Sequence, residues 1–83
     1  MNRIEGKIAL VTGSARGIGR TIVEKLASEG AELVISCDMG EATFEQTNVR
    51  HEILNVTDRD AIKELVKKIK DEFGRIDILV NNA

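Results

Sequence analysis

Apolar residues follow two different spacings along this chain. Nearly continuous apolar runs over 7–12, 32–38 and 75–81 are typical of strands buried on both faces of a sheet. Apolar positions three and four residues apart over 17–29, and again between 57 and 73, predict two amphipathic helices. Gly30 and Gly74 follow these helices where a left-handed cap is expected. A shorter, less apolar run over 51–56 predicts a further strand at the sheet edge.

These elements alternate in a way that defines a fold class. The predicted order is strand, helix, strand, strand, helix, strand, which favours an α/β domain over residues 1–83 with a parallel sheet and right-handed crossovers. In a doubly wound sheet the strands take the order 3-2-1-4, and ligands bind beyond their carboxyl ends. The crossover over 39–49 is predicted to hold at most a turn or two of helix. Thr57 and Asp60 predict the start of the second helix by a pattern close to a capping box.

A glycine-rich turn joins the first strand to the first helix. Gly13, Gly17 and Gly19 have the spacing G-x-x-x-G-x-G, which brings main-chain N–H groups and the positive end of a helix dipole to one place. The expected ligand is a phosphate. The spacing differs from a P-loop, and no lysine follows to reach a terminal phosphate, so a nucleotide triphosphatase is not supported.

Composition excludes several other classes of function. The 83 residues carry 12 Lys and Arg against 14 Asp and Glu, intermixed, with two aromatic residues, so no nucleic-acid surface is expected. No signal peptide or membrane span is present, and a cytoplasmic protein without membrane contact is expected. Cys37 is expected to be a buried, inert thiol. His51 is the only histidine, so no metal site is predicted, and it is interpreted as an ordinary strand-edge residue without a partner.

Three motifs occur together in the order of the predicted elements. They are the turn over 12–19, the sequence Asn55-Val56-Thr57-Asp58 after the third strand, and Asn81-Asn82-Ala83 after the fourth. With them the chain resembles the short-chain dehydrogenase/reductase family from residue 6 to its end. Within that family it is most similar to bacterial 3-oxoacyl-[acyl-carrier-protein] reductases. The resemblance implies the N-terminal half of a doubly wound Rossmann fold.

The resemblance also implies a dinucleotide site. The glycines allow the tight turn and the close approach of pyrophosphate, and the Ile18 N–H faces the ligand. Thr12 or Ser14 offers a hydroxyl to the backbone or to the ligand. Asn55 and Val56 belong to the adenine pocket, and residues 81–83 line the ribose side. The expected cofactor-binding residues are Gly13, Ser14, Arg16, Gly17, Ile18, Gly19, Asp38, Asn55, Val56, Asn81 and Ala83.

The choice between NAD and NADP depends on two residues with opposite effects. Asp38, after the second strand, would accept hydrogen bonds from ribose hydroxyls and repel a 2′-phosphate. Arg16, in the glycine turn, would pair with that phosphate. Asp38 lies one position later than the usual acid of the family, where Cys37 stands, but the short crossover resembles NAD-using members. NAD is therefore favoured over NADP.

Catalysis is not encoded in these residues. The family uses a serine, a tyrosine and a lysine, and this chain contains no tyrosine, so no catalytic residue is assigned. Two hypotheses remain: the cofactor-binding part of an oxidoreductase acting on a small carbonyl or alcohol, or a free-standing nucleotide-binding half-fold without activity. Because residues 78–80 would form a bare sheet edge, the isolated chain is expected either to self-associate into a homo-oligomer or to be poorly folded.

Overall fold

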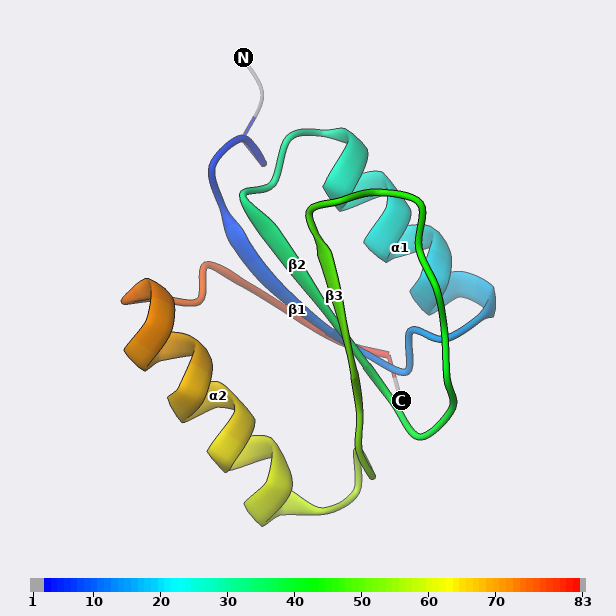
Figure 1. Cartoon of the computed structure of the whole chain (residues 1–83), viewed down its shortest axis with the longest axis vertical. Helices are drawn as coiled ribbons and strands as arrows, with labels where there is room; N and C mark the ends of the chain where they lie inside the picture. The colour runs from blue at the N-terminus through cyan, green and yellow to red at the C-terminus, as the bar shows by residue number, and fades with distance from the viewer. Residues whose placement is uncertain (1–2, 83) are drawn as a thin grey trace.

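The sheet and helices are arranged in the predicted topology. The computed structural model describes residues 3–82, and within them the four parallel strands lie in the order β3-β2-β1-β4 (Figure 1). The α/β fold class and the strand order 3-2-1-4 are thus confirmed. In chain order the elements are β1 (Ile8–Thr12), α1 (Gly17–Ser28), β2 (Leu33–Asp38), β3 (Val49–Ile53), α2 (Arg59–Phe73) and β4 (Ile78–Asn81).

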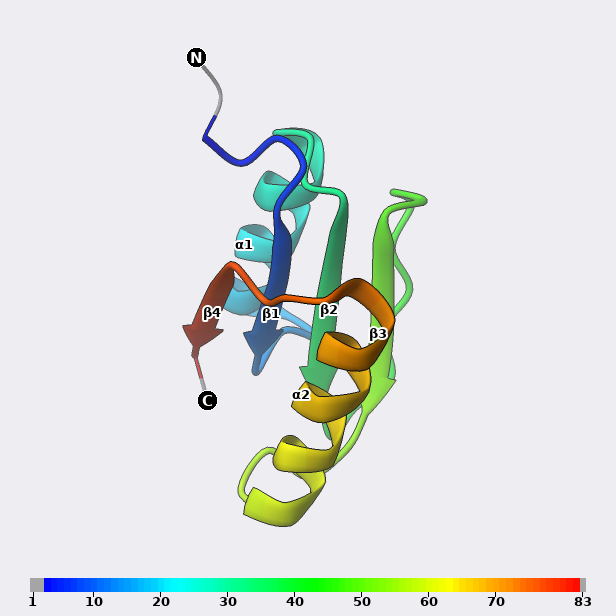
Figure 2. The ribbon, with the colours of Figure 1, turned by 90° about the vertical axis from the view of Figure 1, so that its left-hand side faces the viewer.

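Each helix covers one face of the sheet. Figure 2 shows α1 behind the sheet and α2 in front of it. All five residues of β1 are buried, because this strand has a neighbour on each side and a helix layer on both faces. Its side chains therefore divide between two apolar clusters. One cluster packs Ile8 and Leu10 against α2, and the other packs Ala9 and Val11 against α1.

The third strand begins and ends earlier than predicted. Its observed range pairs in register with Val34 to Asp38 of β2, and Leu54 N–H donates to the Asp38 carbonyl immediately afterwards. The predicted range of 51–56 was wrong by two to three residues, because the partner strand sets the length of an edge strand. Its position at the sheet edge is confirmed.

The fourth strand is shorter than the apolar run that predicted it. Asp77 occupies the place before the strand: its N–H donates to the Ile8 carbonyl, and its Oδ2 accepts from Ile8 N at 2.8 Å. Arg75 binds the same carboxylate at 2.9 Å. These hydrogen bonds and the Arg75 charge hold the pKa of Asp77 below its usual value. The Asp77 carboxylate thus accepts the hydrogen bond from Ile8 N–H that a carbonyl of a neighbouring strand would otherwise accept.

The second crossover contains no helix, which lies within the upper limit of a turn or two that the sequence predicted. Residues 39–48 instead run as an irregular loop beside α1 (Figure 1). Arg20 of α1 holds this loop: Nη2 donates to the Thr43 carbonyl at 2.6 Å, and the guanidinium lies 4.4 Å from the centre of the Phe44 ring. Phe44 packs on the apolar cluster under α1. These contacts with α1, rather than hydrogen bonds within a helix, hold the loop in place.

The helix ends follow the glycines, but one predicted start was wrong. Gly30 and Gly74 have positive φ angles of 93° and 82°, as expected for left-handed caps. The helix α2 is capped by Asp58, whose carboxylate accepts from Asp60 N and Ala61 N, both at 3.1 Å. Thr57 does not cap it, because its hydroxyl donates back to Asn55 Oδ1 at 2.7 Å.

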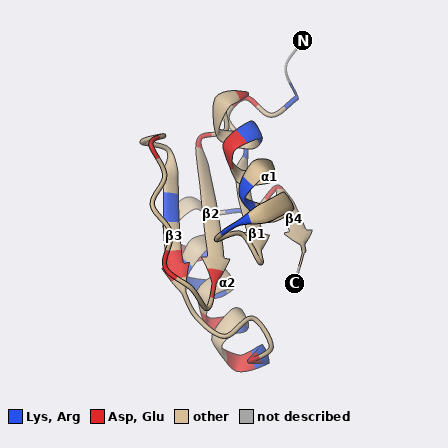
Figure 3. Cartoon of the chain, turned by 90° about the vertical axis from the view of Figure 1, so that its right-hand side faces the viewer, with Lys and Arg blue, Asp and Glu red and all other residues tan. Residues whose placement is uncertain are grey.

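Positions of basic and acidic residues are intermixed along the chain, and both kinds occur on each helix (Figure 3). Among residues 3–82 no group of three potential metal ligands occurs. Neither described helix is long and apolar enough to cross a membrane.

Candidate functional site

The glycine turn brings the start of α1 against the end of β1. Gly13 and Gly17 have positive φ angles of 67° and 68°, which residues other than glycine rarely adopt. Gly19 is required for another reason, because a Cβ built on it would lie 2.0 Å from the Gly13 carbonyl oxygen. At Gly17 the space that a Cβ would enter is open. A ligand can therefore approach the main chain at Gly17, while Gly19 serves close packing inside the turn.

The start of α1 has the features of an anion site. Arg16 occupies the N-cap position with an extended backbone and makes no side-chain capping bond. The first turn of α1 carries no acidic residue. The first N–H groups of a helix lack partners inside it and carry partial positive charge, so they attract anions. The exposed Ile18 belongs to this first turn.

Ser14 is part of the scaffold of the turn. Its side chain is fully buried, and Oγ lies 3.1 Å from the Val11 carbonyl oxygen and 2.7 Å from Ser36 Oγ. The same oxygen accepts from Cys37 N at 2.9 Å. The Ser14 hydroxyl is thus bonded to the main chain and to Ser36, and its contact with a ligand stays a prediction.

The end of β4 is hydrogen-bonded to the same turn. Thr12 Oγ1 lies 3.2 Å from Asn81 Oδ1 and accepts from Asn82 N at 3.2 Å. Asn82 Nδ2 donates to the Gly13 carbonyl at 3.1 Å. The asparagines thus meet the glycine turn, as their positions after a neighbouring strand predicted. Ala83, also expected there, lies outside the described residues.

Asp38 lies at the opposite side of the turn. Its Oδ2 accepts from Ala15 N at 3.0 Å, and Oδ1 accepts from Gly40 N at 3.3 Å. The Ala15 hydrogen bond, above all, holds the pKa of the Asp38 carboxyl below its usual value. The carboxylate therefore keeps its charge at neutral pH. The structure brings Asp38 directly to the glycine turn, although Cys37 stands at the more usual position and is fully buried.

The two expected adenine-pocket residues have different surroundings. Asn55 is exposed and closes a local turn, with Oδ1 accepting from Thr57 N at 2.9 Å. Val56 is half-buried and packs on the apolar cluster under α2. Both follow β3, at the same carboxyl edge of the sheet as Asp38. Their contact with a nucleotide stays a prediction.

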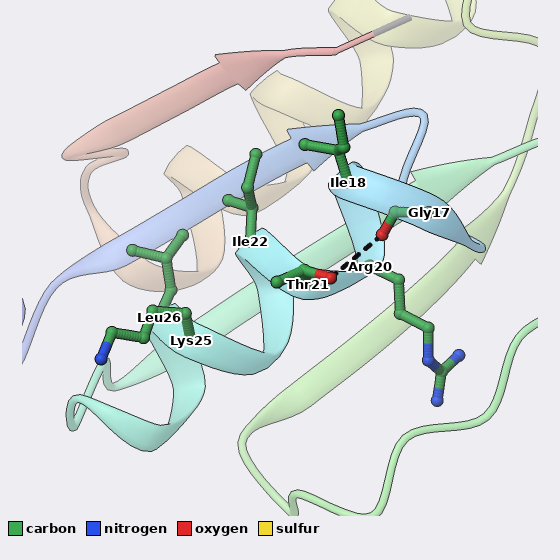
Figure 4. Close-up of a pocket in the computed structure, with 7 residues that line it drawn as sticks. All are labelled: Gly17, Ile18, Arg20, Thr21, Ile22, Lys25 and Leu26. Atoms are coloured by element: carbon green, nitrogen blue, oxygen red, sulfur yellow. Dashed lines mark hydrogen bonds between the residues drawn. The ribbon is translucent and has the colours of Figure 1, made fainter.

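A large groove runs along the flank of α1, from Gly17 and Ile18 in the glycine turn to Leu26. Figure 4 shows Ile18, Ile22 and Leu26 pointing to one side of the helix, while Arg20 points away from them. The open groove measures about 720 Å³, and its lining is mostly apolar. An apolar groove of this kind suits a packing partner rather than a pyrophosphate.

The chain can be compared with known proteins on these features. The family model described as short chain dehydrogenase matches residues 7–83, which include every element of the structure. The chain belongs to the short-chain dehydrogenase family. The resemblance inferred from the three motifs is thus confirmed. The members of this family bind a dinucleotide.

Curated relatives of this chain include reductases. The 3-oxoacyl-[acyl-carrier-protein] reductase FabG of Haemophilus influenzae is 50% identical over 86 residues, covering 96% of this chain and 35% of that protein. The Escherichia coli protein of the same name is 48% identical over 89 residues, covering 95% and 34%. The chain therefore spans about a third of the length of the relatives it matches.

Solved structures of other short-chain dehydrogenases share the fold. The aldohexose dehydrogenase of Thermoplasma acidophilum, in ligand-free form, superposes with a TM-score of 0.87 at 34% identity, covering 99% of this chain and 31% of that one. Carveol dehydrogenase from Mycobacterium avium, in complex with NAD, gives 0.79 at 30% identity, covering 100% and 37%. These likenesses confirm the half of a Rossmann fold that the pattern predicted.

Sequence reasoning missed one pair of residues beside the site. His51 lies on the edge strand β3, as predicted, but the expectation that it has no partner was wrong. Its Nδ1 lies 2.8 Å from Ser36 Oγ, and its Nε2 lies 2.8 Å from the Gly40 carbonyl oxygen. The two side chains come from adjacent strands joined by an irregular loop. No spacing along the chain signals their contact, and only the register of β2 and β3 brings them together.

Proposed function

We propose that this chain is the cofactor-binding part of an NAD(P)-dependent oxidoreductase that transfers hydride between a nicotinamide dinucleotide and a carbonyl or alcohol. The observation that carries the proposal is the uncapped start of α1 at an open glycine turn, with a charged acid beside it. Pyrophosphate suits the helix start, and ribose hydroxyls suit the acid. Family membership and the reductase names of the curated relatives support the reaction class.

The residues of the turn divide the work of holding a dinucleotide. Gly17 leaves room for the pyrophosphate, and the N–H groups from Gly17 through Gly19 provide its donors, Ile18 among them. Gly13 and Ser14 shape the turn that presents these groups. Asn81 and Ala83 would border the ribose of the nicotinamide side, while Asn55 and Val56 would border the adenine. The bound cofactor would supply the hydride.

NAD is favoured over NADP in this proposal. Asp38 is charged and already lies at the turn, so it would accept hydrogen bonds from ribose and repel a 2′-phosphate. Arg16, exposed at the helix start, is the residue that would favour NADP. The structure of the carveol dehydrogenase relative holds NAD, which agrees with this preference.

A second candidate function is a free-standing nucleotide-binding half-fold without catalytic activity. It agrees with the 83 residues, which contain no tyrosine, the general acid of the family. Both candidates need the same dinucleotide site. They differ in whether a catalytic serine, tyrosine and lysine act together with it, so hydride transfer by a longer form of the protein distinguishes them.

Saturable binding of NAD by the 83-residue chain is the expected result that tests the site. Isothermal titration calorimetry with NAD should give one site per chain, and NAD should raise the melting temperature, since a ligand that binds only the folded state stabilises it. Adenosine alone, which lacks the pyrophosphate, is the matched control and should bind far more weakly. The absence of both saturable heat and thermal stabilisation by NAD would contradict the proposed site.

We expect the chain to self-associate through β4, as the proposed homo-oligomer requires. Among the described residues β4 pairs only with β1, so its outer edge is bare, and Leu79 is 65% exposed. Sedimentation velocity at micromolar concentration should show species larger than a monomer. Leu79→Lys should shift them toward monomer, while Lys63→Ala on the exposed side of α2 should not. A monomer with a cooperative melt would contradict this expectation.

A further inference from the structure

A closed ring of hydrogen bonds surrounds the carboxyl end of β2. His51 of β3 stands at one side of this ring, with its imidazole between Ser36 Oγ and the Gly40 carbonyl oxygen, each at 2.8 Å. His51 and Ser36 are paired in the register of the two strands. One side chain thus contacts both the second strand and the loop that follows Asp38.

The ring closes through the glycine turn. Ser36 Oγ lies 2.7 Å from Ser14 Oγ, and the next residue of the turn, Ala15, donates its N–H to Asp38 Oδ2 at 3.0 Å. Asp38 Oδ1 accepts from Gly40 N at 3.3 Å, which returns to the residue whose carbonyl faces His51. The imidazole is therefore built into the same network as the acid proposed to contact the ribose.

The partners of the ring determine where its hydrogens lie when His51 is neutral. The Gly40 carbonyl can only accept, so Nε2 carries the hydrogen and Nδ1 accepts from the Ser36 hydroxyl. Ser36 Oγ then accepts from Ser14, and Ser14 Oγ accepts from Cys37 N at 2.9 Å. Every polar group of the ring has a partner in this state.

Protonation of His51 reverses the hydroxyls without breaking the ring. Nδ1–H would then donate to Ser36 Oγ, and the Ser36 hydroxyl would donate to Ser14 Oγ. The Ser14 hydroxyl would turn to the Val11 carbonyl oxygen, which lies 3.1 Å away. Both charge states of the imidazole therefore fit the same backbone. What changes between them is one positive charge beside Asp38.

Other charged residues lie on the elements around His51, and they contribute to the electrostatic potential there in both charge states of the imidazole. They are Asp38 after β2, Arg16 and Arg20 at the start of α1, Glu41 and Glu45 in the loop, and Arg50 and Glu52 on β3. Arg50 is paired with Glu72 of α2 at 2.9 Å. The pKa of Asp38 lies below its usual value, so its charge stays constant over the range in which imidazoles titrate, between about pH 5 and 8.

We infer that His51 is a specificity-determining residue of the dinucleotide site, whose positive charge at low pH weakens the exclusion of a 2′-phosphate by Asp38. The inference rests on the proposed function, because it needs a ribose at Asp38. The added charge attracts the 2′-phosphate of NADP and leaves NAD, which has no such group, less affected. The ratio of the dissociation constants for NADP and NAD should therefore fall as the pH falls.

The test compares the chain with an uncharged variant that keeps hydrogen-bonding groups at the same place. Dissociation constants for NAD and NADP are measured by calorimetry at about pH 5.5 and about pH 8, for the chain and for His51→Gln. The 2′-phosphate of NADP itself titrates at about pH 6. The quantity attributed to the His51 charge is therefore the difference between the pH profiles of the two proteins, not either profile alone. Between the two pH values the ratio should fall about fivefold further in the chain than in His51→Gln.

One additional measurement and one reserve variant distinguish an effect of the His51 charge from a merely structural effect. The nitrogen-15 shifts of the imidazole should report an Nε2–H tautomer at high pH, as the ring requires. If His51→Gln does not fold, His51→Asn serves as the uncharged reference. Parallel pH profiles in the chain and in the reference would overturn the role of His51, with dinucleotide binding intact. Failure to bind either dinucleotide at any pH would instead overturn the proposed function, and this inference with it.

Discussion

Gly19→Ala is expected to destabilise the fold by about 3 kcal/mol and to abolish dinucleotide binding. The added Cβ would lie 2.0 Å from the Gly13 carbonyl oxygen and 2.8 Å from its carbonyl carbon. Both atoms belong to the main chain at the end of β1, so no side-chain rotation relieves the overlap. The helix α1 would have to move away from the sheet, and its first N–H groups would leave the position in which they meet the pyrophosphate.

Thermal unfolding followed by circular dichroism measures this effect. A loss of about 3 kcal/mol in a domain of this size should lower Tm by roughly 10–20 °C. Gly40→Ala is the matched control: its Cβ would meet only Ala15 Cβ at 3.9 Å, an ordinary contact. That variant should melt close to the unchanged chain. A Gly19→Ala protein with unchanged Tm and NAD affinity would show that the turn is not packed as the structure has it.

Asp38→Asn is expected to shift the preference between the two dinucleotides toward NADP by about tenfold, or ~1.4 kcal/mol. The carboxylate is charged at neutral pH because its hydrogen bonds, that from Ala15 first, lower its pKa. Asparagine keeps an oxygen that can accept from Ala15 N, so the turn is retained while the charge is removed. Repulsion of the 2′-phosphate is lost, and Arg16 then meets no competing acid.

Dissociation constants for NAD and NADP, measured at neutral pH for each protein, give the preference as a ratio. Glu41→Gln is the control, because it removes one negative charge from the same loop without touching the glycine turn; it should leave the ratio nearly unchanged. Asp38→Ala should act in the same direction as Asp38→Asn. An equal ratio before and after both Asp38 substitutions, in proteins that still bind NAD, would remove Asp38 from the choice of cofactor.

The element order and the glycine turn follow directly from the sequence because local physics determines them, and the strand order then follows from the rule for doubly wound sheets. Continuous apolar runs occur where strands are covered on both faces, and the caps at Gly30 and Gly74 need a backbone that only glycine adopts readily. The motif glycines are equally local, since a turn between β1 and α1 has few solutions. These features were predicted from neighbours in the chain and hold in the structure.

Features that depend on partners distant in sequence were not predicted in the same way. The range of β3 is set by β2, and the early start predicted for β4 failed because Asp77 takes the place of a strand residue beside Ile8. The loop after Asp38 is held by Arg20 from α1, which no spacing within the loop reveals. The contact of His51 with Ser36 likewise arises from strand pairing.

The rate at which the buried Cys37 thiol is alkylated would report how often the sheet opens around β2. Cys37 is the only cysteine, its side chain is fully buried in the apolar cluster under α2, and burial, above all, raises the pKa of its thiol to about 11. Alkylating reagents need an accessible thiolate, so they label this residue only while β2 is exposed. The labelling rate is thus proportional to the fraction of molecules in which the inner strand β2 is exposed. A dinucleotide that binds only the native state would slow the labelling, and a tighter ligand would slow it more.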